Sequence, residues 1–248
     1  MKYSIITAVY NGEKYISRLM ASVFNQSYPN IEWIVQDGGS KDGTLDKLRP
    51  HADRIKLVSE PDSGMYDAWN KALGRATGDW AIFLGADDFF ISPHSIAQCH
   101  RHLRGMPPHI DIAYGALLMG NNGKAEHLLN RTMHRAYNTF LSDMGVPFPA
   151  TFIRVPVLQR ERFDASYKIA GDFEFVARIL SGDNVARLPI IVSYMEMGGL
   201  SSDSSNCTLL EERLRALYAH IAPKAREIME TSINHVVDND DSLEAIPD

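Results

Sequence analysis

The strongest constraint on the fold is a short apolar run, residues 80–84, that ends at two adjacent aspartates. The run follows a Gly-Asp turn and is rich in residues that favour strands, so it predicts a strand covered on both faces. Asp87 and Asp88 come just beyond its carboxyl end, where open α/β sheets bind ligands. Two neighbouring carboxylates repel each other unless a cation or a donor neutralises them, and their oxygens suit Mg²⁺ or Mn²⁺. The alternative is a solvated Asp-Asp turn.

The residues before this strand alternate between strands and helices. Apolar and β-branched runs predict strands at 3–10, 31–36 and 55–59, and amphipathic spacing predicts helices at 14–25, at 44–53 and up to Arg75. This order is typical of an α/β protein with a parallel, doubly wound sheet. Since parallel strands end at one edge, we expect the polar residues that follow them to meet there: Tyr10, Asn11, Asp37, Glu60, Asp62, Asp87 and Asp88.

Beyond Asp88 the pattern is mixed. It predicts helices at 93–103, from Ala170 onward and at 209–229, and strands at 110–119, 150–154 and 184–193. Asn121-Asn122-Gly123 is typical of a hairpin turn. In the last helix, one apolar face is expected from four residues, Leu210, Leu214, Leu217 and Ile221. The stretch 198–202 is rich in Gly and Ser and predicts a flexible segment, and the acidic end, 238–248, predicts disorder.

Composition narrows the class of protein. The 248 residues are 45% hydrophobic and 23% charged, as in a soluble globular protein. The net charge of −6 argues against a nucleic-acid partner. Cys99 and Cys207 match neither a disulfide framework nor a metal motif. The start of the chain does not read as a signal peptide, and no apolar run approaches the roughly 20 residues that span a bilayer.

We therefore expect a cytoplasmic protein. Peripheral contact with the inner face of the membrane is the open alternative for the helix 209–229, which carries Arg213, Arg215, Lys224 and Arg226.

Five blocks of sequence together resemble the inverting glycosyltransferases of family 2, and in particular bacterial members that build surface or exopolysaccharide repeat units. They span residues 3–200 in the right order, which is far more specific than a single short motif. The blocks are SIITAVYN (4–11), NQSYPNIEWIVQDGGSKDGT (25–44), SEPDSGMYDAWNKAL (59–73), ATGDWAIFLGADD (76–88) and FDASYKIAGDFEFVARIL (163–180).

The resemblance implies the GT-A fold, a Rossmann-like domain with a mixed, mostly parallel sheet flanked by helices. We expect this domain at residues 1–205, a C-terminal helical extension at 206–235 and a disordered acidic tail at 236–248. It also implies a nucleotide-diphospho-sugar donor, with UDP as the expected nucleotide, and Mn²⁺ or Mg²⁺ as the metal.

The resemblance further implies site residues along the sheet edge. The nucleotide pocket would be lined by Ala8 and Tyr10 and bordered by Asp67 and Asn70, and Asp37 would contact the base or ribose. The glycines after Asp37 permit close approach of a ligand, although Asp37 can equally be read as a turn residue.

The resemblance also implies which residues bind the metal and which residue is the catalytic base. Asp87 and Asp88 occupy the metal-binding position, with Asp87 also facing the donor, while Gly85 stands where the family has its first acid. Residues 148–149 stand where many members have a histidine. Asp172 matches the catalytic base, although a helix-start acid favoured by the helix dipole is the plain alternative.

These assignments predict transfer of a hexose or N-acetylhexosamine to a glycan or lipid-linked acceptor with inversion. Direct displacement needs one carboxylate base, whereas a nucleophilic carboxylate would retain configuration. Glu174 would point away from Asp172 on a helix and is the weaker candidate. The alternatives are a sugar nucleotidyltransferase, whose Gly-rich basic phosphate loop is unlike residues 10–13, and a non-catalytic binding module on a degenerate transferase fold.

Overall fold

The computed structural model describes residues 1–130, 146–181, 183–199, 206–224 and 226. Within them, nine strands form one sheet. Their order across the sheet is β3 (Lys56–Ser59), β2 (Ile31–Asp37), β1 (Tyr3–Val9), β4 (Trp80–Phe83), β8 (Thr151–Arg154), β6 (Ile112–Asn121), β9 (Val185–Glu196) and β5 (Phe89–Phe90), and β7 (Lys124–Leu129) pairs with β6.

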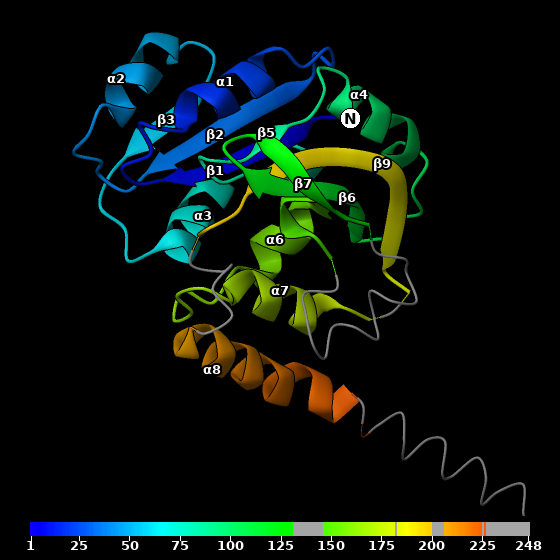
Figure 1. Cartoon of the computed structure of the whole chain (residues 1–248). Coiled ribbons are helices and arrows are strands. Elements are labelled where there is room, and N and C mark those ends of the chain that lie inside the picture. The colour runs from blue at the N-terminus through cyan, green and yellow to red at the C-terminus, as the bar shows by residue number, and fades with distance from the viewer. Residues whose placement is uncertain (131–145, 182, 200–205, 225, 227–248) are drawn as a thin grey trace, which may run out of the picture.

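Helices cover both faces of this sheet (Figure 1). One face carries α1 (Ile16–Phe24), α2 (Thr44–Leu48, extended by a 3₁₀ turn Arg49–His51) and α4 (Ser95–Leu103). The other carries α3 (Met65–Leu73), α6 (Val155–Glu161) and α7 (Gly171–Ile179). A further helix, α8 (Cys207–Ala216), continues into a π-helical turn Leu217–Ile221 and lies outside α7. A short 3₁₀ turn, Phe148–Ala150, precedes β8.

The central strand β4 shows why both faces are covered. Its four residues are all buried, and they alternate between two apolar layers. Trp80 and Ile82 join the layer under α1 and α4, whereas Ala81 and Phe83 join the layer under α3, α6 and α7. Because successive side chains point to opposite faces, a strand with no polar residue must be covered on both sides.

One half of the sheet has the parallel strands expected from the sequence. Strands β3, β2, β1 and β4 are neighbours and all run parallel. The connection from β4 onward is antiparallel at β8, so the whole sheet is mixed. Residues 121–123 form the turn between β6 and β7, as the Asn-Asn-Gly signal indicates.

Strands β5 and β7 and helix α6 were absent from the expectations, and several boundaries differ from the expected ones by a few residues. Strand β5 has only two residues and exists through pairing with β9, which lies about one hundred residues away in sequence. Helix α6 is short and carries a proline in its first turn. Its sequence therefore lacks the apolar periodicity that would predict a helix. Helix α4 begins at Ser95 after His94 rather than at Pro93.

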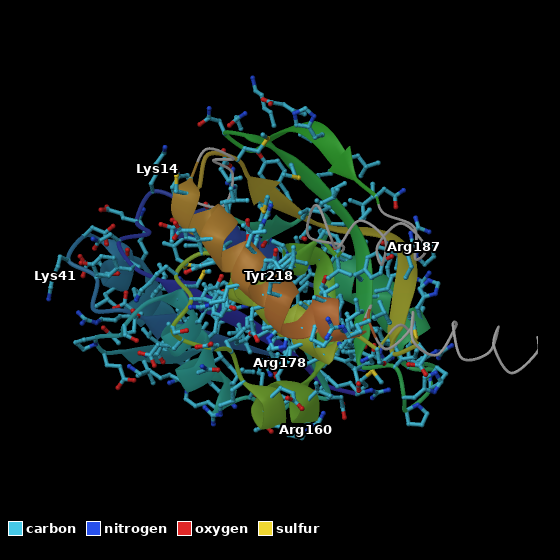
Figure 2. All side chains as sticks on the ribbon, turned by 90° about the horizontal axis from the view of Figure 1, so that it is seen from below. Lys14, Lys41, Arg160, Arg178, Arg187 and Tyr218 are labelled. Atoms are coloured by element: carbon cyan, nitrogen blue, oxygen red, sulfur yellow. The ribbon has the colours of Figure 1, made fainter. Side chains whose placement is uncertain are left out.

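The expected apolar face of the last helix is only partly confirmed. Leu217 and Ile221 are partly buried against the core, but the side chains of Leu210 and Leu214 are 58% and 44% exposed. The buried face is formed instead by Leu209, Glu212 and Ala216. Apolar spacing misses this face because one of its three residues is a carboxylate. Figure 2 looks onto the helix from outside, where the exposed Tyr218 lies on the π-helical turn.

Several expectations fall outside the described residues. These include most of the Gly/Ser stretch, the end of the helix beyond residue 226 and the acidic tail. The boundary between the domain 1–205 and the helical extension 206–235 therefore stays a prediction. In the part of the chain that is described, no helix has both the length and the apolar character to cross a membrane.

The amino ends of the parallel strands are joined by the buried carboxylate of Glu32. It accepts hydrogen bonds from the Ser4 hydroxyl at 2.6 Å and from the Thr77 backbone N–H at 2.7 Å. Two ammonium groups also reach it, Lys2 at 2.6 Å and Lys56 at 2.7 Å. Burial alone would raise the pKa of Glu32, but the bonds from Lys2, Lys56, Ser4 and Thr77 hold it well below its ordinary value.

We predict that Glu32→Gln lowers the free energy of unfolding by about 3 kcal/mol at neutral pH, because charged donors then face a neutral amide. The folded-state pKa is depressed, so this stabilisation is complete above the unfolded value and is lost as pH falls. The difference from wild type in urea unfolding should therefore shrink between pH 7 and pH 3. The exposed Glu126→Gln serves as control, and an equal loss at both pH values would contradict the assignment.

Candidate active site

A cavity of about 430 Å³ opens at the carboxyl end of β4. Three of the predicted site residues line it: Asp87 and Asp88 from the turn after β4, and Asp172 from the start of α7. Glu196 at the end of β9 contributes a further carboxylate. The topology brings these groups together because β4 and β9 end near one another while α7 packs beneath them.

The turn after β4 holds its two aspartates in different environments. The backbone N–H of Gly85 donates to Asp88 Oδ2 at 2.8 Å, and Asp88 is buried. Burial raises the pKa of Asp88, and the charge of Asp87 raises it further. Burial also raises the pKa of Asp87, which is partly exposed to the cavity. Arg18 binds the carbonyl oxygen of Asp87 at 2.7 Å rather than either carboxylate.

The same Arg18 joins this turn to β9. Its guanidinium also contacts Glu196 at 2.6 Å and lies 4.5 Å from the centre of the Phe89 ring. Two distant segments are thereby fixed against each other at the rim of the cavity.

The carboxylates of this turn fit a divalent cation that is also held by the phosphates of a bound molecule. Among the described residues, no group of three or more His, Cys, Asp or Glu side chains is arranged to hold a metal. Asp87 and Asp88 supply two carboxylates, which is what Mg²⁺ commonly takes from a protein when phosphates complete its shell. A Cβ at position 85 would lie 2.7 Å from Asp87 Oδ1. A larger residue there would therefore require the Asp87 carboxylate to move.

Asp172 is the second residue of α7 and is held from two sides. Its Oδ1 accepts the backbone N–H of Phe173 at 2.8 Å and lies 3.3 Å from the hydroxyl of Tyr66. Burial raises the pKa of Asp172 to about 6, although these hydrogen bonds and the charge of Arg213 oppose the rise. Gly171 allows the arrangement, since a Cβ there would lie 2.7 Å from the Tyr66 ring.

The other predicted residues lie outside the cavity lining, along the ends of β1 and β2 or on α3. Ala8 is partly buried, and the Tyr10 side chain is 64% exposed. Asp37 is fully buried, where it accepts the N–H groups of Gly39 and Ser40, each at 3.0 Å, and the Ser59 hydroxyl at 2.6 Å. Its carboxylate therefore braces the loop after β2.

The two residues on α3 also have partners within the protein. Asp67 accepts the N–H of Ser63 at 3.0 Å and lies 3.2 Å from Lys71. The Asn70 amide bonds to both backbone groups of Phe163, at 2.8 and 3.0 Å. Contact of these residues with a nucleotide stays a prediction, whereas their structural contacts are evident.

Three functional candidates escaped sequence reasoning. The ring of Tyr66 is buried, and its hydroxyl reaches Asp172. Arg213 and Glu196 line the cavity although the sequence gives no local sign of it. Each contact joins segments far apart in the chain, so no spacing rule could reveal it.

Comparison with known proteins identifies the family and the fold. The profile of the family described as Glycosyl transferase family 2 matches residues 4–152. A PGL/p-HBAD biosynthesis glycosyltransferase of Mycobacterium tuberculosis is 27% identical over 210 residues, covering 81% of this chain and 79% of that protein.

Two solved structures share the fold. S. aureus TarS in complex with UDP-GlcNAc aligns with a TM-score of 0.67 and 22% identity, over 83% of this chain and 61% of that one. The mannosyltransferase PcManGT of Pyrobaculum calidifontis, in complex with GDP-Man and Mn²⁺, aligns with a TM-score of 0.63 and 20% identity, over 91% and 64%. This chain thus spans less than two thirds of either structure. The curled, mostly parallel sheet with helices on both faces is the GT-A fold.

We predict that Tyr66→Phe raises the pKa of Asp172 above its wild-type value of about 6. The hydroxyl favours the ionised carboxylate, so its removal favours the protonated form. Carboxyl ¹³C NMR titration of the two proteins measures the shift. Tyr3→Phe, which removes a buried hydroxyl bonded to His100 instead, should leave that titration unchanged. An unaltered or lowered pKa in Tyr66→Phe would refute the contact.

Proposed function

The chain belongs to glycosyl transferase family 2, and from this premise we propose that it transfers a hexose or N-acetylhexosamine, with inversion, from a nucleotide-diphospho-sugar to a glycan or lipid-linked acceptor. The observation that carries the proposal is the meeting of Asp87, Asp88 and Asp172 in one cavity. A pair of carboxylates suited to a cation and a separate single carboxylate are the groups that this reaction requires.

Asp172 is the proposed general base. It takes the proton of the acceptor hydroxyl as that oxygen attacks the anomeric carbon, so the bond to the nucleotide diphosphate breaks in the same displacement. A pKa of about 6 leaves it ionised at neutral pH but still basic enough to accept a proton. Glu174 is no rival, because its buried carboxylate is paired with Arg178 at 2.8 Å and with His220 at 2.9 Å.

Asp87 and Asp88 would hold Mn²⁺ or Mg²⁺ together with the diphosphate of the donor. When bound, such a cation neutralises the charge that develops on the leaving diphosphate. The presence of Mn²⁺ in the PcManGT complex supports this choice. Arg18 keeps the two carboxylates in place by holding the backbone of the turn.

The donor nucleotide would lie along the ends of β1 and β2, beside the cavity. UDP is our first choice, supported by the UDP-GlcNAc complex of TarS. The exposed ring of Tyr10 offers a face on which a base can stack. The remaining residues proposed to shape this pocket are Ala8, Asp37, Asp67, Asn70 and, on the side of the phosphates, Asp87.

Four apolar side chains of the cavity lining favour an acceptor with an apolar group next to its sugar. Met119 comes from β6, Leu129 from β7, Met195 from the end of β9 and Met197 from just beyond it. Methionine side chains adapt to irregular apolar ligands. A lipid-linked sugar therefore fits this wall better than a free one.

The binding-module alternative keeps one argument, the glycine at position 85. That argument is weakened because Asp87 and Asp88 still supply two carboxylates to the cavity. The family match supports the transferase over a nucleotidyltransferase.

We predict that Asp172→Asn abolishes transfer, with a loss of at least about 10²-fold, while nucleotide binding is kept. Binding is measured as the rise in melting temperature with UDP, GDP or dTDP, each with and without Mn²⁺. Asp88→Asn should remove the part of the rise that depends on Mn²⁺. The matched control is Asp164→Asn, which changes an exposed acid in a loop. This variant should retain turnover.

The pH dependence of kcat/KM provides a second test of the role of Asp172. Asp172 acts as a base only when ionised, so kcat/KM of the wild type should rise with pH through about 6 and then level off. Full turnover by Asp172→Asn would rule out this base. Nucleotide binding by wild type without turnover of any donor would favour the binding module.

We predict that an octyl glycoside is a better acceptor than the same free sugar, by at least about tenfold in kcat/KM, since each buried CH₂ contributes about 0.8 kcal/mol. Met197→Ser should reduce this preference, because it replaces part of the apolar wall with a hydroxyl. Met106→Ser, outside the cavity lining, is the control. Equal rates with both acceptors would remove the argument for a lipid-linked acceptor.

A further inference from the structure

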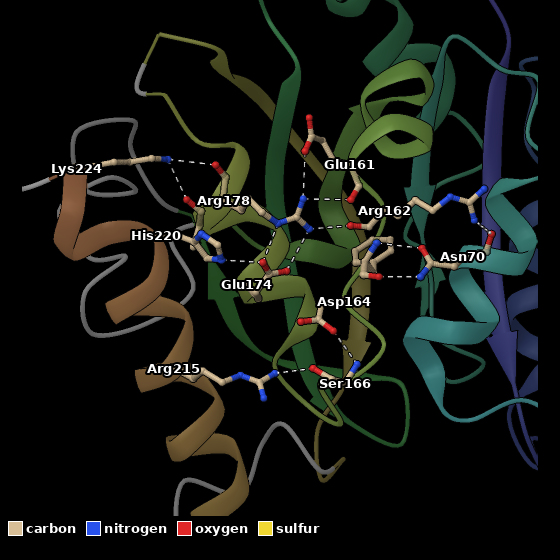
Figure 3. Close-up of polar contacts among 12 residues, drawn as sticks. Asn70, Glu161, Arg162, Asp164, Ser166, Glu174, Arg178, Arg215, His220 and Lys224 are labelled. Carbon is tan, nitrogen blue, oxygen red and sulfur yellow. Dashed lines mark hydrogen bonds and ion pairs between the residues drawn. The ribbon is translucent and has the colours of Figure 1, made fainter.

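Helix α8 and its π-helical continuation contact both ends of α7, the helix that carries Asp172. At the far end, Lys224 Nζ donates to the carbonyl oxygens of Ala177, Arg178 and Leu180, at 3.1, 3.2 and 2.6 Å. Figure 3 shows this lysine and His220, whose ring lies 2.9 Å from Glu174 on α7. These contacts satisfy carbonyl groups that the end of a helix leaves without partners.

At the near end, the contact is made by a single carboxylate. Glu212 is 8% exposed, and it accepts three consecutive backbone N–H groups. Its Oε1 accepts from Lys168 at 2.6 Å, and its Oε2 accepts from Ile169 at 2.9 Å and from Ala170 at 2.8 Å. Hydrogen bonds to an ionised acceptor are stronger than neutral ones, and three donors compensate for burying the charge.

The segment held by Glu212 leads directly into the proposed base. Ala170 occupies the N-cap position of α7, and its methyl side chain cannot cap the helix. The carbonyl of Ile169 accepts the Tyr66 hydroxyl at 2.6 Å, and the same hydroxyl lies 3.3 Å from Asp172. Glu212 therefore fixes the amide side of this segment, while Tyr66 fixes its carbonyl side.

We propose that α8 is a positioning element of the catalytic centre, in which Glu212 holds the backbone of residues 168–170 and thereby sets the place of Asp172. The inference rests on the proposed role of Asp172 as the base. The neighbouring residue on α8, Arg213, lines the cavity, so the helix reaches the site as well as supporting it. A misplacement of about 1 Å can slow an enzyme about 10²-fold.

A purely structural role for α8 is the competing explanation. Leu209 and Ala216 are buried against the core, so loosening the helix anywhere would lower stability. The two explanations differ in where on the helix a change affects turnover. Under the positioning role, only the contact at residues 168–170 matters for the rate.

The test compares two substitutions at opposite ends of the contact with α7. Glu212→Gln replaces the shared carboxylate by an amide whose NH₂ group faces a backbone donor, and Lys224→Met removes the distant contact. Glu211→Gln, an exposed glutamate next in sequence, is the matched control. The measurements are kcat, the KM for the donor, the pH profile, melting temperature and hydrogen exchange at the amides of residues 168–170.

For Glu212→Gln we expect kcat to fall about 10²-fold with an unchanged donor KM, faster exchange at residues 168–170 and a displaced acid limb in the pH profile. Lys224→Met should lower the melting temperature but keep kcat, and Glu211→Gln should match wild type. Glu212→Asp keeps the charge on a shorter side chain, so it should fold and give an intermediate kcat. This variant supplies the comparison if the glutamine variant does not fold.

The inference is overturned if the Glu212 variants turn over like wild type, or if Lys224→Met loses as much kcat as Glu212→Gln. Absence of turnover by the wild type with every donor would instead contradict the proposed function. In both Glu212 variants, slow exchange at residues 168–170 would overturn the inference independently of any assay of transfer.

Discussion

The burial of β4 on both faces is the constraint on which the site depends. This strand carries no polar side chain along its length, and two aspartates follow in the turn where it ends. At the carboxyl end this places Asp87 and Asp88 in the cavity. At the opposite edge of the sheet, Glu32 gathers the amino ends of the neighbouring strands. The charged groups at one edge of the sheet thus hold strands together, whereas those at the other edge belong to the proposed active site.

The parts of the site that follow from a single segment could be predicted from the sequence. An apolar run followed by two acids is enough to place Asp87 and Asp88 at a strand end, and the context of Asp172 is enough to place it at a helix start. The alternation of strands and helices in the parallel half follows from the same local patterns. In each case, the physical cause lies within about ten residues of chain.

The parts that could not be predicted depend on contacts between distant segments. Tyr66 and Asp172 are 106 residues apart, and the Glu212 contacts span 42 to 44 residues. The face of α8 was mispredicted for the same reason: Glu212 is buried because it meets backbone donors from another segment, and apolar spacing takes no account of such donors. Strand β5 likewise exists only through its partner β9.

The two halves of the proposed chemistry are therefore supported in different ways. The carboxylates after β4 lie in the turn that follows this strand, where Asp88 accepts the backbone N–H of Gly85 and Arg18 holds the carbonyl of Asp87. Asp172 belongs to a helix whose entry segment has no cap of its own and is held by Tyr66 on one side and by Glu212 on the other. The family profile ends at residue 152, before both Asp172 and Glu212. A base acts only when it lies within hydrogen-bond reach of the acceptor. Under the role proposed for Asp172, the placement of the base therefore depends on the part of the chain beyond the profile.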